Sequence, residues 1–113
     1  MRLSEKQAIF AVNVAKLILH INDSGYTCTF GEVYRTSEQA QWNAARGIGI
    51  ADSLHCIRLA VDLMLFKDGV WTTSGEHYRP FGEYWKTLNS LNRWGGDFKM
   101  RDYVHFEMKE ASA

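Results

Sequence analysis

The longest hydrophobic stretch lies near the start of the chain, where apolar residues surround a narrow polar stripe. Between residues 4 and 23 the polar positions recur at helical spacing: Lys6, Asn13, Lys16, His20 and Asp23. A helix with so thin a polar stripe is mostly buried. Ser4 and Gln7 have the spacing of a capping box, and Gly25 is a natural C-terminal stop. We therefore predict a buried first helix between Ser4 and Gly25.

The remaining pattern alternates between β-prone and helical segments. The predicted elements are a strand at 26–34, a helix at 37–46 capped by Thr36, strands at 59–66 and 70–72 joined by a tight turn, a helix with Pro80 in its first turn, and a strand at 103–108. This order predicts an α+β fold with an antiparallel sheet and packed helices, in a single domain spanning residues 1–113.

Composition narrows the function classes. Hydrophobic residues make up 46% and charged residues 23% of the 113 residues, which is typical of a globular protein. Lys+Arg and Asp+Glu are 13 each, so no charge excess favours a nucleic acid or an anionic membrane. We expect a monomer with no nucleic-acid partner and no stable membrane insertion. Cys28 and Cys56 are expected to be free thiols of a chain made in a reducing cytosol, and no signal-peptide pattern follows Met1.

Asp62 is unusual because it lies in one of the most apolar stretches of the sequence. A buried carboxylate is costly unless it is paired or binds a metal. On its own, an aspartate that accepts backbone N–H bonds from a loop would be the simpler interpretation. His55, in the loop before this strand, and His105, in the last strand, change that interpretation, since neighbouring strands would let all three converge. Two imidazoles and one carboxylate form a common catalytic zinc set, although the same set also holds non-haem iron.

Two further residues are candidates for catalysis. Asp102 precedes the last strand, where it is suited to act as a general base. On spacing alone, an ordinary turn aspartate beside Arg101 is the simpler interpretation. Arg35 follows the predicted strand at 26–34 and is suited to stabilise an oxyanion, although a solvated arginine at a helix start is commoner.

Three blocks of sequence carry a resemblance to a known family. Residues 53–63 (SLHCIRLAVDL) resemble the S-x-H-x-x-G-x-A-x-D motif of the D-alanyl-D-alanine carboxypeptidase family, whose members include phage L-alanyl-D-glutamate endopeptidases. Residues 93–98 (RWGGDF) and 102–107 (DYVHFE) resemble its W-G-G-D and D-x-x-H-F-E block. Residues 32–36 (EVYRT) resemble its E-x-Y-R-T/S segment, so the similarity spans roughly residues 32–108.

The resemblance implies a role for each matching residue. His55, Asp62 and His105 align with the zinc ligands, and Asp102 aligns with the catalytic carboxylate. Arg35 aligns with the arginine that contacts the substrate carbonyl, and Ser53 with a serine at the substrate subsite. The implied fold is the α+β fold shared with hedgehog signalling domains. Arg58 stands where many members have glycine, so the turn there is expected to differ, and Val104 stands where many have proline.

We therefore predict a zinc metallopeptidase that hydrolyses the peptide stems of bacterial peptidoglycan by attack of a metal-bound water. The resemblance favours the L-Ala–D-Glu bond and a phage endolysin, made in the host cytoplasm and released to act on the cell wall in the periplasm. Two alternatives remain open. One is a D-alanyl-D-alanine carboxypeptidase or dipeptidase. The other is a non-catalytic zinc-stabilised binding module, against which Asp102 argues because such a module needs no base.

Overall fold

A computed structural model describes residues 1–47 and 53–110 of the chain. The helices and strands follow one another in the order α1 (Leu3–Asp23), β1 (Tyr26–Phe30), α2 (Ser37–Ala45), β2 (Ala60–Lys67), β3 (Val70–Thr72), α3 (Gly75–Leu88), β4 (Asn92–Trp94) and β5 (His105–Met108). Two short 3-10 helices, η1 (Leu54–Ile57) and η2 (Gly95–Asp97), precede β2 and follow β4. The α+β class predicted from the sequence is confirmed. None of the described helices is long and apolar enough to cross a membrane.

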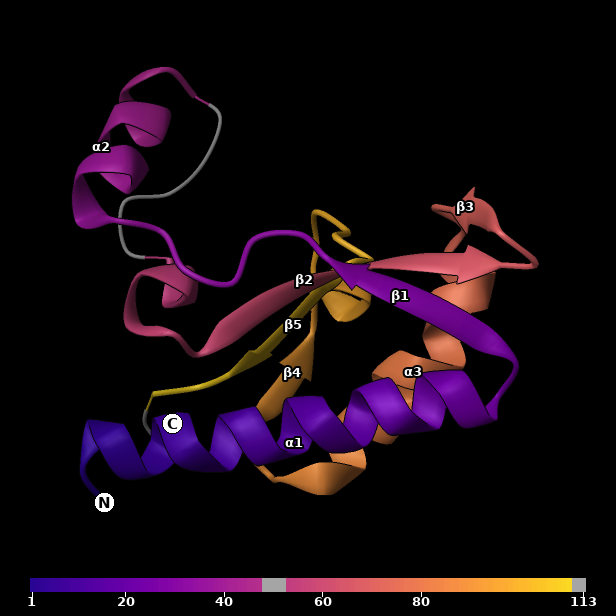
Figure 1. Cartoon of the computed structure of the whole chain (residues 1–113). Coiled ribbons are helices and arrows are strands. Elements are labelled where there is room, and N and C mark those ends of the chain that lie inside the picture. Colours follow the sequence, from indigo (N-terminus) through magenta and orange to yellow (C-terminus); the bar gives the residue numbers. More distant parts are fainter. Residues whose placement is uncertain (48–52, 111–113) are drawn as a thin grey trace.

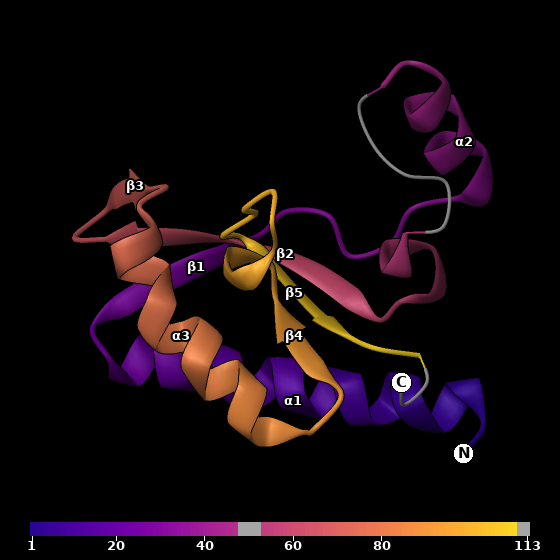
Figure 2. The same cartoon turned by 180° about the vertical axis from the view of Figure 1, so that it is seen from behind.

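The five strands form one sheet in which every pairing is antiparallel. The order is β1-β2-β5-β4, and β3 pairs with the end of β2 as the second strand of the predicted hairpin. The longest strand, β2, therefore contacts three of the others. Helices α1 and α3 cover one face of the sheet, while α2 stands apart from them at one end (Figures 1 and 2).

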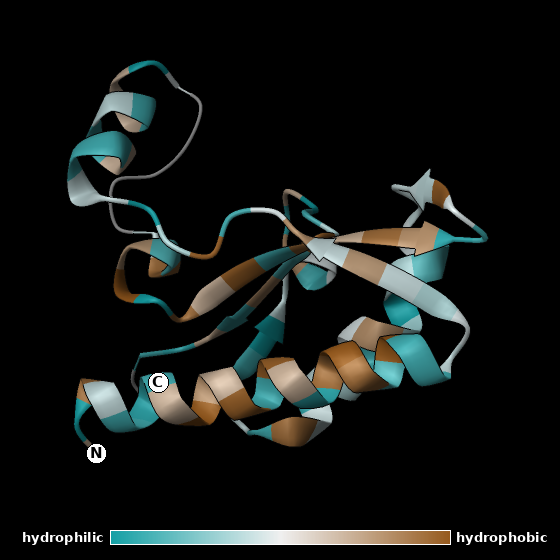
Figure 3. Ribbon diagram, viewed as in Figure 1, coloured by the Kyte–Doolittle hydropathy of each residue, from teal (hydrophilic) through white to brown (hydrophobic). Residues whose placement is uncertain are grey.

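The hydrophobic core lies between the sheet and the helices α1 and α3. Alternate residues of β2 point into it: Val61, Leu63 and Leu65 are almost completely buried. Aromatic side chains of α3 and β4, among them Trp85 and Trp94, complete the core, and α3 packs so tightly there that any side chain at Gly82 would collide with the Trp94 ring. Figure 3 shows hydrophobic residues along α1 and β2, whereas α2 is mostly hydrophilic. The opposite face of β2, which carries Asp62, does not pack into this core and can hold a functional site.

Several local predictions differ from the structure; the strand predicted at 26–34 ends at Phe30, and the one predicted at 103–108 begins at His105. The first helix begins at Leu3 after Arg2, whose side chain makes no capping bond, so the predicted Ser4–Gln7 capping box does not form. The third helix begins five residues before Pro80, at Gly75, because the hydroxyl of Ser74 accepts the N–H of Glu76 and caps it. Strand β4 was not predicted, because its three residues are too few for a recognisable alternation and lack the tight-turn signal that marks the equally short β3. By contrast, Thr36 does cap α2, accepting the N–H of Gln39 at 3.0 Å.

Tyr78 on α3 stabilises the middle of β2, and this gives a testable consequence. Its hydroxyl accepts the N–H of Leu65 and donates to the carbonyl of Leu63, both at 2.9 Å. Tyr78→Phe would leave both buried backbone groups unpaired, so we expect a loss of about 1–3 kcal/mol in the free energy of unfolding. Urea denaturation followed by circular dichroism measures this loss.

Tyr84→Phe is the control for that measurement. The Tyr84 ring stacks on His20 with centroids 3.9 Å apart, and its hydroxyl makes no hydrogen bond within residues 1–47 and 53–110. We expect its stability to be nearly that of the wild type. Equal stability of the Tyr78 and Tyr84 variants would show that the strand does not depend on the Tyr78 hydroxyl.

Candidate metal centre

Asp62, His105 and His55 meet on the face of the sheet that the helices do not cover. Strands β2 and β5 are neighbours, and Asp62 and His105 lie directly opposite each other in their register. His55 is brought to the same place by η1, where the N–H of Leu59 donates to the carbonyl of Leu54 and folds the loop back onto the start of β2. The three residues thus converge although 50 positions separate His55 from His105 in the sequence.

The facing atoms are one oxygen and two ring nitrogens. Asp62 Oδ1 lies 3.3 Å from His55 Nε2 and 3.2 Å from His105 Nδ1, and the three candidate donor atoms lie within 4.8 Å of one another. Both imidazoles are buried and Asp62 is largely so, which shields the cluster from bulk water. Each histidine therefore presents a defined nitrogen to the same small volume.

The electrostatics of this cluster suit a cation. Burial alone would raise the pKa of Asp62, but hydrogen bonds from His105 and His55 lower it to about 2. Burial alone would lower the pKa of His105, but its hydrogen bonds with Asp62 and Glu107 raise it to about 9. A site that holds a carboxylate ionised and attracts positive charge to an imidazole provides the environment that a divalent metal ion also requires.

The donor set and its dimensions fit zinc. Zinc favours imidazole and carboxylate ligands in tetrahedral geometry, and bonds of about 2.0–2.1 Å imply about 3.3 Å between neighbouring ligand atoms. The two distances from Asp62 Oδ1, 3.3 and 3.2 Å, agree with that tetrahedral edge. The residues present thus match the group that the sequence predicts.

Two glutamates that the sequence analysis gave no role lie behind the histidines. Glu107 Oε1 is 2.7 Å from His105 Nε2, the ring nitrogen that points away from Asp62. Glu32 Oε1 lies 3.7 Å from the corresponding far nitrogen, Nδ1 of His55. The signal for Glu107 was its position two residues after His105, because strand residues at that spacing share a face.

From its sequence position, a solvated surface arginine was the commoner interpretation of Arg35. The structure instead shows an arginine that is largely buried. Its side chain is only 16% exposed, and Nη2 lies 2.5 Å from Glu32 Oε1. Its backbone N–H donates to the carbonyl of His55, which fixes it beside η1. Within residues 1–47 and 53–110, the buried Nε of Arg35 has no hydrogen-bond partner. A buried N–H donor is therefore available beside the cluster.

Asp102 lies in the loop immediately before β5, next to the cluster but outside it. Its N–H donates to the carbonyl of Gly95, and its own carbonyl accepts the N–H of His105. Although the residue is exposed overall, partial burial of its carboxyl raises its pKa, and the charges of His105, Asp62 and His55 also act on it. Any side chain at Gly95 would collide with the Asp102 carbonyl oxygen, so this close approach requires glycine.

Ser53 and Arg58 shape the two ends of η1. The Ser53 hydroxyl accepts the N–H of His55 at 3.2 Å and caps the turn that carries the imidazole. Arg58 adopts φ 56° and ψ 38°, the left-handed conformation that glycine favours. The conformation is therefore one that the glycine common at this position would adopt without strain. The Arg58 guanidinium lies 4.0 Å over the ring of Tyr34.

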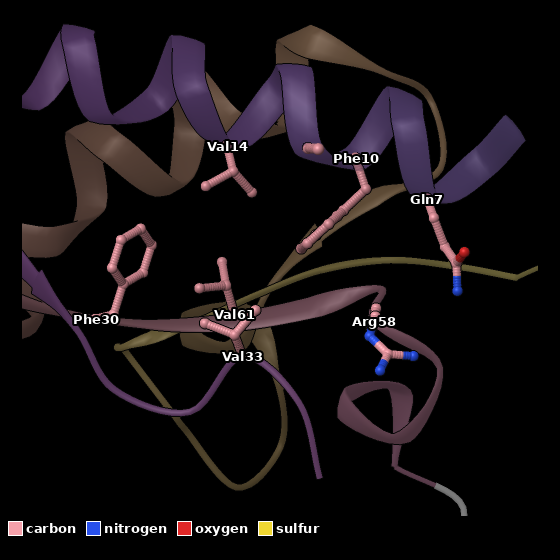
Figure 4. A pocket seen from close by; sticks show the side chains of 8 residues that line it. Gln7, Phe10, Val14, Phe30, Val33, Arg58 and Val61 are labelled. Atoms are coloured by element: carbon pink, nitrogen blue, oxygen red, sulfur yellow. The ribbon is translucent and has the colours of Figure 1, made fainter. Parts of the chain in front are cut away.

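A separate apolar cavity of about 310 Å³ lies on the other face of the sheet. Figure 4 shows Phe10 and Val14 of α1 facing Phe30, Val33 and Val61 across it. Since Val61 and Asp62 are consecutive residues of β2, their side chains point to opposite faces. This cavity contributes no ligand to the metal centre.

Comparison with known proteins identifies the family. The sequence model of the family described as D-alanyl-D-alanine carboxypeptidase matches residues 47–108, more than half of the chain. The chain belongs to this family. The sequence prediction of a zinc-dependent peptidoglycan peptidase is thereby confirmed at the level of the family, and so is zinc as its cofactor. A comparison with curated proteins found no match.

Two solved structures have a similar fold. One is the L-Ala D-Glu endopeptidase ChiX of Serratia marcescens, with a TM-score of 0.65 and 20% identity over 74% of this chain and 67% of that one. Another is the E175A mutant of the vancomycin-resistance D,D-pentapeptidase VanY, solved with Zn(II), with a TM-score of 0.62 and 19% identity over 88% of this chain and 70% of that one. At these identities the similarity is one of fold, and this chain shares the α+β architecture of both.

Proposed function

We propose that this family member is an endopeptidase that cleaves the L-Ala–D-Glu bond of the peptidoglycan stem, with zinc held by His55, Asp62 and His105. The observation that carries the proposal is the convergence of two imidazole nitrogens on Asp62 Oδ1, at 3.3 and 3.2 Å, with Asp102 and Arg35 beside them. A glycosidase would instead require two carboxylates facing each other across the sugar, one of them protonated.

Each neighbouring residue has a role in this proposal. Zinc in such a set supplies Lewis-acid polarisation and activates water at neutral pH. Asp102 takes the proton of the attacking water and returns it to the amide nitrogen as the C–N bond breaks, a role that its raised pKa favours. Arg35 donates from its buried guanidinium to the oxygen of the scissile carbonyl, where negative charge develops. Ser53, at the start of η1, is assigned to the substrate subsite.

The choice of bond rests on similarity. The fold of ChiX, an L-Ala D-Glu endopeptidase, and the motifs shared with phage endopeptidases support the L-Ala–D-Glu bond. The same motifs support a phage endolysin that acts as a monomer on the cell wall after synthesis in the host cytoplasm. The second candidate is cleavage at terminal D-alanine, which the description of the matching family and the fold of the D,D-pentapeptidase VanY favour.

Digestion of purified peptidoglycan with and without a chelator tests the proposal. We expect new N-terminal D-Glu amino groups, detected by mass spectrometry, and no new reducing sugar ends. Thorough chelation is expected to abolish the reaction and zinc to restore it. Full activity after chelation would contradict the metal centre, and new reducing ends would contradict peptide hydrolysis. Release of free D-alanine with the L-Ala–D-Glu bond intact would assign the enzyme to the second candidate.

A further inference from the structure

Three side chains, His105, Glu107 and Arg93, form a row of hydrogen bonds and ion pairs that leads away from the metal centre. His105 Nε2 lies 2.7 Å from Glu107 Oε1, and the other carboxylate oxygen, Oε2, accepts from Arg93 Nε at 2.7 Å and from Nη2 of the same arginine. Glu107 is only 5% exposed. Burying a carboxylate is costly, so a glutamate this deep needs both of its partners.

All residues of this row lie on strands of the sheet, and none lies in a loop. His105 and Glu107 share one face of β5 because they are two residues apart, and Arg93 of β4 lies directly opposite Glu107 in the register. On the other side of β5, Asp62 of β2 lies directly opposite His105. The row Arg93, Glu107, His105, Asp62 therefore crosses three adjacent strands in a fixed order.

The two sides of the His105 ring are consequently distinct. Nε2 is bonded to Glu107 Oε1 at 2.7 Å, whereas Nδ1 faces Asp62 Oδ1 at 3.2 Å. A metal ion in the volume shared by Asp62 Oδ1, His55 Nε2 and His105 Nδ1 would therefore meet Nδ1, while Nε2 would keep its bond with Glu107. A ligating histidine whose other nitrogen bonds to a carboxylate is held in one tautomer and one orientation, and it is a more basic ligand.

We propose that Glu107, clamped by Arg93, is a positioning residue that fixes His105 to bind the metal through Nδ1. Glu107 acts through His105 and does not touch the substrate. The inference rests on the proposed function only in taking His105 as a zinc ligand. Glu32 stands behind His55 less closely, at 3.7 Å and one-third exposed, so the two histidines are not equally constrained.

The test measures metal binding and not turnover. Zinc dissociation constants are determined by competition with a chromophoric chelator for the wild type, Glu107→Gln and Arg93→Lys. Glutamine keeps the size of the side chain but loses the charge that Arg93 clamps and that strengthens the bond from His105. We expect zinc to bind about 10–100-fold more weakly to Glu107→Gln. Arg93→Lys keeps the charge but not the planar fork, so we expect a smaller loss of affinity.

Glu83→Gln is the matched control. Glu83 pairs with Lys86 at 2.9 Å on the exposed surface of α3, so we expect its zinc affinity to equal that of the wild type. A Co²⁺-substituted sample adds a second readout, since the visible absorption of cobalt reports its ligand geometry. We expect that spectrum to change in Glu107→Gln and to stay unchanged in the control.

The outcomes separate this inference from the proposed function. A wild type that binds no stoichiometric zinc contradicts both. A wild type that binds zinc, with unchanged affinity and cobalt spectrum in Glu107→Gln, contradicts the positioning role alone and leaves a purely structural pair. Thermal unfolding of the metal-free proteins shows whether each variant is folded. If Glu107→Gln is unfolded, the measurement on Arg93→Lys decides. Wild-type zinc affinity in Arg93→Lys would then overturn the proposal.

Discussion

Replacing Asp102 by asparagine is expected to lower kcat by about 10²–10⁴-fold while zinc content and fold stay intact, because proton transfer by a positioned side chain contributes about that much. Asparagine has the same shape as aspartate but cannot accept the proton of the attacking water. The backbone bonds that hold the loop, from the Asp102 N–H to Gly95 and from the His105 N–H to Asp102, do not involve the side chain and persist. The measurements are steady-state kinetics on peptidoglycan fragments and elemental analysis of the purified variant.

Asp97→Asn is the control for this prediction. Asp97 lies in η2, in the segment that leads to Asp102, but it is exposed and its carboxylate binds Lys86 at 2.7 Å. We expect wild-type turnover from this variant. Loss of zinc from Asp102→Asn would make Asp102 a ligand, and near-normal turnover would remove it from the mechanism.

The second large effect is expected at Arg35. Arg35→Lys keeps the positive charge beside Glu32 but loses the planar guanidinium with its several donors. Loss of one donor to a developing oxyanion commonly lowers kcat by about 10²–10³-fold. Because Arg35 is not one of the proposed metal ligands, its replacement should reduce kcat and leave zinc content unchanged.

Arg46→Lys controls for the general effect of replacing an arginine. Arg46 lies at the end of α2 with its guanidinium 3.8 Å over the exposed Trp42 ring, and it has no contact with the cluster among the described residues. We expect wild-type kinetics from it. If Arg35→Lys were equally active, the pair with Glu32 would have to be regarded as structural only.

The faces of β2 and β5 can be derived from the sequence because alternation is a local property. Because side chains alternate along a strand, Val61 and Leu63 in the core leave Asp62 on the other face, and Phe106 in the core likewise leaves His105 on the other face of β5. The predicted metal site required these two strands to be neighbours, and the sequence alone did not show that they are. Pairing depends on contacts across the fold, and the register that sets Asp62 against His105 is visible only in the structure.

The features that were missed depend on such long-range contacts. Glu107 resembles an ordinary strand glutamate in the sequence, because its buried pairing with Arg93 depends on β4, a strand that was not predicted. The early start of α3 depends on the cap at Ser74, while Pro80 suggested a later one because proline is most common in the first turn of a helix. The unusual backbone of Arg58 leaves no trace in a sequence, since few arginines adopt positive φ.

The opposition of Asp62 and His105 also bears on how the protein tolerates insertions and deletions. The two residues are 43 positions apart in the chain, yet their separation in space is set by one cross-strand pair. Adding or removing one residue within β2 or β5 would turn Asp62 or His105 toward the helices, since side chains alternate between faces. Length changes between the end of β2 and the start of β4 would leave the pairing of Asp62 with His105 unchanged. Among active homologues, insertions and deletions should therefore occur in the connecting turns and not in these two strands.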